Sequence, residues 1–215
     1  MQSKVILITT AILIIAPAVF FFACDFGNLP AGKRLLASVF QSVTTRTAGF
    51  NTEDLSLMTE AGKAVMILLM LIGGSPSSTA GGMKTTTFAV LILNALATFR
   101  SREDAGAFGR RFDGQVVKNA ATIAMMYFML FFFGGITISV YEGLPLLTCL
   151  YEAASAVGTV GLTLGITPEL HIISRLILIA LMYLGRVGGM TLIYAVFSRK
   201  NNNGAKMPLE KITVG

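Results

Sequence analysis

The sequence carries the stretch Val157-Gly158-Thr159-Val160-Gly161-Leu162-Thr163 between two apolar segments, the first of which opens with Leu144-Pro145. A related stretch, Thr47-Ala48-Gly49-Phe50, lies upstream in the same setting, after a short run opened by Leu29-Pro30. A single Thr-x-Gly triplet is common by chance, so the second copy carries the argument. The matched settings indicate two copies of one structural unit.

An alignment of the chain with itself supports this repeat. One constant offset pairs Thr47 with Thr159, Gly49 with Gly161, Lys63 with Arg175 and Gly73 with Gly185. Further on the offset is five residues smaller, and Gly82-Met83 falls on Gly189-Met190. Each unit then reads as a span, a short helix that enters and leaves the membrane on one side, a loop and a second span. The alternative is chance similarity between hydrophobic segments.

The composition is that of an integral membrane protein. Of 215 residues, 54% are hydrophobic and 13% are charged. These values and the long apolar runs predict an all-α membrane fold. We expect no enzyme activity, because His171, Cys24 and Cys149 have neither catalytic partners nor metal-ligand spacing. The sequence also lacks Gly-x-Gly-x-x-Gly and Walker motifs, so no organic cofactor is expected.

The charges predict an orientation. The net charge of +6 is concentrated at Lys4, in one loop (Arg100, Arg102, Arg110, Arg111, Lys118) and in the tail (Arg199, Lys200, Lys206, Lys211). By the positive-inside rule these regions and both termini are cytoplasmic, and no nucleic-acid partner is expected. Seven of the eleven acids then lie on the outer side: Asp25, Glu53, Asp54, Glu60, Glu142, Glu152 and Glu169. There they would concentrate cations at a pore mouth.

Four spanning segments are expected, in two units. The first unit covers 1–100 and has a broken second helix, and a basic cytoplasmic linker covers 101–115. The second unit covers 116–198, and a cytoplasmic tail covers 199–215. A cleaved lipoprotein signal ending before Cys24 is the alternative for the first span, but its apolar run is long for one. The segment from Pro30 to Val43 is too short to span, which predicts a re-entrant helix.

The two matched loops have the features of an ion selectivity filter. A dehydrated cation needs a ring of carbonyl oxygens, and glycine allows the backbone conformations that turn carbonyls inward. The candidate filter residues are Thr45, Arg46, Thr47, Ala48, Gly49, Phe50, Val157, Gly158, Thr159, Val160, Gly161 and Leu162. An ordinary turn is the alternative for both glycines. A second glycine of the Thr-Val-Gly-Tyr-Gly kind is absent, which predicts weaker discrimination against sodium.

A glycine-rich stretch interrupts the second predicted span. Its residues are Gly73, Gly74, Ser75, Pro76, Ser77, Ser78, Thr79, Ala80, Gly81 and Gly82. A surface linker is one interpretation, and an uncharged loop inside the membrane, lining the water path, is the other. Arg186 lies about 20 Å from the cytoplasmic end of a straight helix, a depth at which an unpaired cation costs about 3 kcal/mol. The loop's free carbonyls are its natural acceptors, and Lys84 adds a second positive charge.

Four motifs resemble the Trk/Ktr/HKT potassium transporters, and most of all the membrane subunit of bacterial Ktr systems. They are Thr44–Asn51, Gly81–Thr87, Ala156–Leu162 and Gly185–Gly188. The tail also resembles the Pro-x-Glu-Lys-Ile ending of such subunits. Members of the family carry four units, whereas this chain has two that look like the third and fourth. The resemblance therefore implies a C-terminal half, a truncated product or an incomplete gene model.

The resemblance implies potassium transport across the plasma (inner) membrane, passive or linked to sodium. It also implies that the glycine-rich loop, Lys84 and a buried Arg186 form a gate under the filter. Arg46 and Arg34 are expected near the outer mouth, where Arg46 either braces the loop or is a rim cation. The implied partners are membrane lipid, a second copy or an N-terminal half, and a nucleotide-binding regulatory subunit on the basic loop and tail. A sodium-permeable or weakly selective transporter and a non-conducting fragment are the alternatives.

Overall fold

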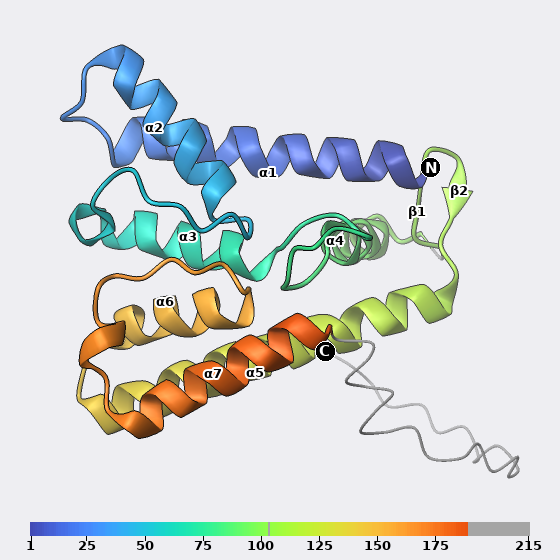
Figure 1. Cartoon of the computed structure of the whole chain (residues 1–215). Helices are drawn as coiled ribbons and strands as arrows, with labels where there is room; N and C mark the ends of the chain where they lie inside the picture. Colours follow the sequence, from blue (N-terminus) through green and yellow to red (C-terminus); the bar gives the residue numbers. More distant parts are fainter. Residues whose placement is uncertain (103, 189–215) are drawn as a thin grey trace, which may run out of the picture.

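The computed structural model describes residues 1–102 and 104–188, which form a mostly helical protein (Figure 1). The first half contains α1 (Gln2–Cys24), α2 (Ala31–Thr44), the 3-10 turn η1 (Leu55–Leu57), α3 (Glu60–Leu71) and α4 (Thr85–Phe99). The second half contains α5 (Gly114–Glu142), α6 (Leu146–Val157), the 3-10 turn η2 (Thr167–Glu169) and α7 (Ile172–Val187). The predicted helical class is confirmed. The tail 199–215, the last part of the 116–198 unit and the Gly189-Met190 match lie outside the described residues.

The linker between the halves differs from the prediction. It contains a two-stranded antiparallel hairpin of β1 (Gly106–Ala107) and β2 (Arg110–Arg111), which the sequence did not predict because two-residue strands are too short for a pattern. Helix α5 begins inside the predicted linker, since the Asp113 side chain accepts a hydrogen bond from the Gln115 N–H at 3.1 Å. That contact is the N-cap geometry that favours a helix start.

Helices α1 and α5 are long and apolar enough to cross a membrane, by length and composition. Helix α1 leaves a belt of large apolar side chains exposed, among them Leu7, Ile12, Ile15 and Val19. So large an exposed apolar surface is unusual in soluble proteins and suits contact with lipid. The second predicted span is divided at the glycine-rich stretch into α3 and α4, of 12 and 15 residues.

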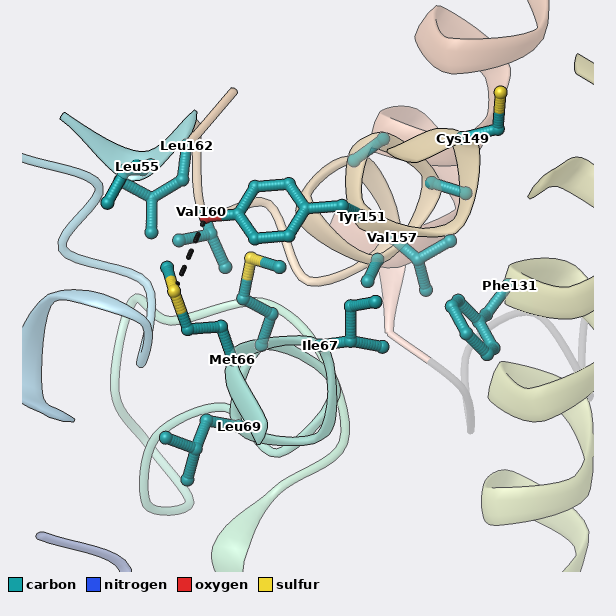
Figure 2. Packing of buried hydrophobic residues seen from close by; sticks show 14 of the residues in the cluster. Leu55, Met66, Ile67, Leu69, Phe131, Cys149, Tyr151, Val157, Val160 and Leu162 are labelled. Carbon is teal, nitrogen blue, oxygen red and sulfur yellow. Dashed lines mark hydrogen bonds between the residues drawn. The ribbon is translucent and has the colours of Figure 1, made fainter. Parts of the chain in front are cut away.

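The short helix α6 lies at the centre of the protein. It packs among α3, α5 and α7, and all its residues from Tyr151 to Val157 are buried. Figure 2 shows Tyr151 reaching across to α3, where its hydroxyl donates to the Met66 sulfur at 3.8 Å. Neighbouring backbones come very close: a Cβ at Gly185 would lie 1.9 Å from the Val157 carbonyl oxygen. The core therefore surrounds α6 and fixes where its C-terminal end points.

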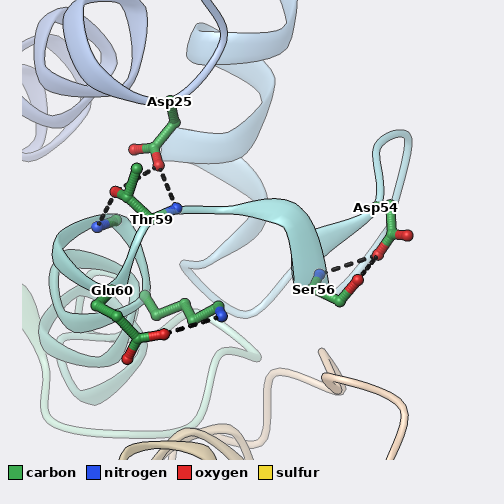
Figure 3. Close-up of polar contacts among 7 residues, drawn as sticks. Asp25, Asp54, Ser56, Thr59 and Glu60 are labelled. Carbon is green, nitrogen blue, oxygen red and sulfur yellow. Dashed lines mark hydrogen bonds and ion pairs between the residues drawn. The ribbon is translucent and has the colours of Figure 1, made fainter.

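In each half, an acidic side chain accepts hydrogen bonds from the residue at the start of the helix that follows the candidate filter loop. The Asp25 carboxylate accepts from the N–H and hydroxyl of Thr59, at 2.8 and 2.7 Å, where α3 begins (Figure 3). In the second half Glu142 accepts from the His171 N–H at 3.0 Å, where α7 begins. Thr59 and His171 are aligned by the same offset that aligns the loops. Both acids thus tie the C-terminal end of the first helix of a unit to the start of the helix that follows the loop.

Figure 3 also shows a second, more exposed polar contact near η1. The Ser56 hydroxyl and N–H donate to Asp54 at 2.6 and 2.9 Å. These hydrogen bonds, the hydroxyl first, hold the pKa of Asp54 below its ordinary value.

We predict that Thr59→Ala lowers the stability of the protein in detergent by about 1 kcal/mol, because it removes the N-cap of α3. The lost contacts are the hydroxyl bond to Asp25 and the bond that the same oxygen accepts from the Gly62 N–H at 3.0 Å. Thermal unfolding measures the change. Ser56→Ala is the matched control, since its hydroxyl contacts Asp54 at the three-residue turn η1 and is not the N-cap of an α-helix. Equal losses in the two variants would contradict the capping role.

Candidate functional site

Two short helices bring the candidate filter loops to the middle of the protein. Helices α2 and α6 both follow a proline, Pro30 and Pro145, at the N-cap position. Proline suits a helix start because the N–H that it lacks would have no helical partner there. The loops begin where the helices end, so the partial negative charge of each helix C-terminus lies beside a loop. A cation near the loops would be stabilised by both helices.

The two loops have the same unusual backbone at aligned positions. Thr47 and Thr159 have φ of 68° and 50°, and Gly49 and Gly161 have φ of 75° and 96°. Residues with side chains rarely adopt positive φ, so a threonine in this conformation at the same place in both loops is uncommon. The alternation of positive-φ positions re-aims successive carbonyl groups within each loop.

The two loops are packed directly against each other. The Thr47 hydroxyl donates to the Gly158 carbonyl oxygen at 3.4 Å. A Cβ at Gly49 would lie 2.0 Å from the Val160 carbonyl oxygen, which leaves no room for a side chain. Nothing lies within 4 Å of a Cβ at Gly161, so that glycine faces open space. Gly49 is therefore required by sterics and conformation, and Gly161 by conformation alone.

Hydroxyl groups at the helix ends hold each loop. The Thr44 hydroxyl accepts from the Phe50 N–H at 2.8 Å, and the Ser155 hydroxyl accepts from the Gly161 N–H at 3.2 Å. Other predicted filter residues face away from the loop contact. Thr45 is fully buried and bonds back into α2, Val157 and Leu162 are buried in the core, and Phe50 is exposed.

The glycine-rich loop between α3 and α4 lies against the second filter loop. Its base is closed by backbone hydrogen bonds from Gly73 N–H to Met83 O at 2.8 Å and from Met83 N–H to Leu71 O at 3.1 Å. A Cβ at Gly81 would lie 2.1 Å from the Thr159 hydroxyl oxygen. This loop, residues 73–82, which we label the gate loop after its predicted role, thus touches a threonine of the second candidate filter loop.

Three cationic side chains donate to carbonyls of the gate loop. Arg186 donates to the Thr79 carbonyl and Lys84 to the Ala80 carbonyl. Arg46 donates to the Gly73 carbonyl at 3.3 Å. Between the first filter loop and the gate loop lies a cavity of about 360 Å³, lined by Thr10, residues 46–48 and gate-loop residues.

Three side chains depart from their expected places. Arg46 lies against the gate loop and not near the outer mouth, because it follows the last turn of α2. Arg34 does lie at the outer end of α1, where it donates to the Phe22 carbonyl at 2.6 Å. Arg186 is exposed, not buried, because no described residue covers that side of α7. Glu152, expected among the outer acids, is buried in the C-terminal part of α6, where all residues from Tyr151 to Val157 are buried.

Comparison with known proteins identifies the family. The family described as TrkH, cation transport protein, matches residues 1–204. The potassium/sodium uptake protein NtpJ of Enterococcus hirae is 38% identical, over 100% of this chain and 50% of its own length. The Ktr system potassium uptake protein B of Bacillus subtilis is 35% identical, over 88% of this chain and 42% of its own length.

A solved structure shares the fold. The potassium transporter TrkH of Vibrio parahaemolyticus superposes with a TM-score of 0.71 at 20% identity, covering 91% of this chain and 44% of that one. The chain thus spans about half the length of the relatives that it matches. These matches confirm the resemblance drawn from the four sequence motifs: the chain belongs to the TrkH family of cation transport proteins.

Proposed function

We propose that this chain supplies two filter loops of a pore that carries potassium across the plasma membrane. The observation that carries the proposal is the pair of aligned loops, which share positive φ at Thr47/Thr159 and at Gly49/Gly161 and pack against each other. Carbonyls re-aimed in this way can replace the water shell of a cation. NtpJ is named a potassium/sodium uptake protein and the Ktr protein a potassium uptake protein, and both names agree with potassium as the cargo.

The filter is completed by further loops around the same axis. Two loops surround an ion on one side only, while a carbonyl filter encloses it. We propose that a second copy of this chain or an N-terminal half supplies the remaining loops. Neither loop has a second glycine of the Thr-Val-Gly-Tyr-Gly kind, which predicts weaker discrimination against sodium. Selectivity for potassium therefore has to be measured against sodium. A chain that needs an N-terminal half would be non-conducting alone.

The gate loop closes the path below the filter in this proposal. It packs on Thr159 at Gly81, and its carbonyls are held by Arg46, Lys84 and Arg186. Three positive charges beside the path oppose the passage of a cation. If the gate loop were released from Arg186, both the loop that obstructs the path and the positive charge beside it could move. We therefore assign gating to the hydrogen bond between Arg186 and the Thr79 carbonyl.

The membrane orientation follows from charge and exposed apolar surface. We propose that the exposed belt of α1 faces lipid and that the basic hairpin of residues 106–111 and both termini are cytoplasmic, as the positive-inside rule predicts. We propose this hairpin and the tail as the docking place of a nucleotide-binding regulatory subunit. The arginines of the hairpin are exposed, as such a contact requires.

The first experiment measures potassium and sodium flux into liposomes that contain this chain, alone and with an N-terminal half. We predict selective potassium flux, abolished by Gly49→Ala and reduced by Gly161→Ala. The backbone conformation alone costs a side chain about 1–2 kcal/mol, and Gly49→Ala adds a clash with Val160.

Gly32→Ala is the matched control for both variants, since it lies in α2 with open space around its Cβ. Its flux is expected to equal that of the original chain. Equal sodium and potassium flux would favour the weakly selective transporter. Flux that survives in Gly49→Ala would contradict the filter assignment, and flux only with the N-terminal half would identify this chain as a dependent half.

A second experiment tests the gate. Arg186→Ala is predicted to raise potassium flux about tenfold, because losing one charge-assisted hydrogen bond of about 1.5 kcal/mol frees the gate loop. Arg175→Ala is the control, since Arg175 lies in the same helix but donates to Pro168 at its outer end. If both variants carry the same flux as the original chain, Arg186 does not hold a gate.

A further inference from the structure

Helix α6 contains a buried carboxylate whose partners all lie beyond the filter loop. Glu152 exposes 4% of its surface, although it belongs to a residue type that is seldom buried. Its Oε1 accepts from the Thr163 hydroxyl at 2.7 Å and from the Leu164 N–H at 2.9 Å. Its Oε2 accepts from the Thr167 hydroxyl at 2.8 Å. Among the residues that the structure describes, no lysine or arginine forms a salt bridge with it.

The chemistry of these contacts suits a carboxylate that holds residues 163–167 against α6, and we call this set of contacts the tether. A carboxylate offers acceptors only, and here it meets three donors, two hydroxyls and one backbone N–H. Hydrogen bonds to an ionised acceptor are shorter and stronger than neutral ones. The two hydroxyl oxygens lie 3.0 Å apart, and because each has one proton, both protons can be used on Glu152. Breaking one of these contacts would leave a buried polar group unpaired.

The tether acts next to Gly161, where packing holds the loop only through the buried neighbours Val160 and Leu162. Gly161 has φ of 96° and nothing within 4 Å of a Cβ, so no side chain holds this part of the loop from outside. The Ser155 hydroxyl holds the Gly161 N–H on the inner side at 3.2 Å. On the outer side, the next hydrogen-bonded points are Thr163 and Leu164, both bonded to Glu152. The position of the intervening carbonyls therefore depends on hydrogen bonds from α6 together with the buried side chain of Leu162.

The first filter loop has no such carboxylate on the helix that precedes it, α2. The position aligned with Glu152 is Phe40, which has no polar group. Its loop is closed locally, by the Thr44 hydroxyl on the Phe50 backbone at 2.8 Å. In contrast to Glu152, no described side chain of α2 is hydrogen-bonded to residues 51–55, which follow this loop, and Gln41 of α2 donates instead to the Met66 sulfur of α3. The two loops of the chain are thus supported by different chemistry.

We propose that Glu152 is a positioning residue that sets ion selectivity by holding the outer return of the second filter loop, residues 163–167. This inference rests on the proposed filter function. When the loop is held in place, its carbonyl oxygens cannot move closer together to coordinate sodium, which is smaller than potassium. Loosening the loop would let them do so and would admit sodium. Loss of the tether lowers the potassium-to-sodium flux ratio and leaves potassium flux present.

The test compares Glu152→Gln with Glu169→Gln, the same change at an exposed residue of the same segment. Amide hydrogen exchange of the full chain in detergent is measured for segments 160–168 and 44–51. Glu152→Gln is expected to speed exchange of 160–168 about tenfold, the factor for about 1.4 kcal/mol of lost hydrogen bonding. Segment 44–51 and the Glu169→Gln protein are expected to be unchanged.

Flux ratios in liposomes provide the second measurement. Glu152→Gln is expected to lower the potassium-to-sodium ratio several-fold, in the assembly that conducts. Thr167→Val, which removes one donor with little change in shape, is expected to give a smaller drop, and Thr167→Ser to restore the original ratio. These two variants keep the test decisive if Glu152→Gln does not fold.

Unchanged exchange in Glu152→Gln and Thr167→Val overturns the tether. Faster exchange with an unchanged flux ratio overturns the selectivity role. If the original chain carries no potassium in any assembly, the proposed function fails and the selectivity role fails with it. Exchange still decides the tether in that case, so the two failures are distinguishable.

Discussion

Where the backbone is not helical inside a membrane, its N–H and C=O groups have no water as a hydrogen-bond partner. This constraint explains how the chain is built. Such backbone is tolerated only where protein or a water-filled path satisfies it. Both loops and the gate loop accordingly pack against other parts of the chain, with Thr44, Ser155, Arg46 and Arg186 supplying hydrogen-bond partners. The buried helix α6 and its neighbours form the frame that positions these partners.

Close backbone approach is the second feature on which the site depends. Gly49, Gly81 and Gly185 each lie where a Cβ would fall about 2 Å from an atom of another segment. The contacts join the first loop to the second, the gate loop to Thr159, and α7 to the end of α6. A change in one of these segments is therefore transmitted to the next, which would let the proposed gate act on the proposed filter.

Much of the fold could be predicted from sequence because long apolar runs and their interruptions are local signals. The bounds of α2 differ by one residue from the predicted Pro30 to Val43, and α5 begins two residues before the predicted 116, a difference that Asp113 explains. The hydrogen-bond partners of side chains that belong to different segments were harder to predict from the sequence. A charge count placed Glu152 outside and Arg46 at the outer mouth, whereas their contacts depend on how α6 and the gate loop pack. The Leu164 N–H bonded by Glu152 has no sequence signature.

The most direct measurement is the anomalous scattering of thallium, a potassium mimic, in crystals of the assembled transporter. Binding by backbone carbonyls predicts thallium density beside residues 47–49 and 159–161, and its loss in Gly49→Ala. Density that is absent from both loops, or that persists in Gly49→Ala, would contradict the assignment of these loops as the filter.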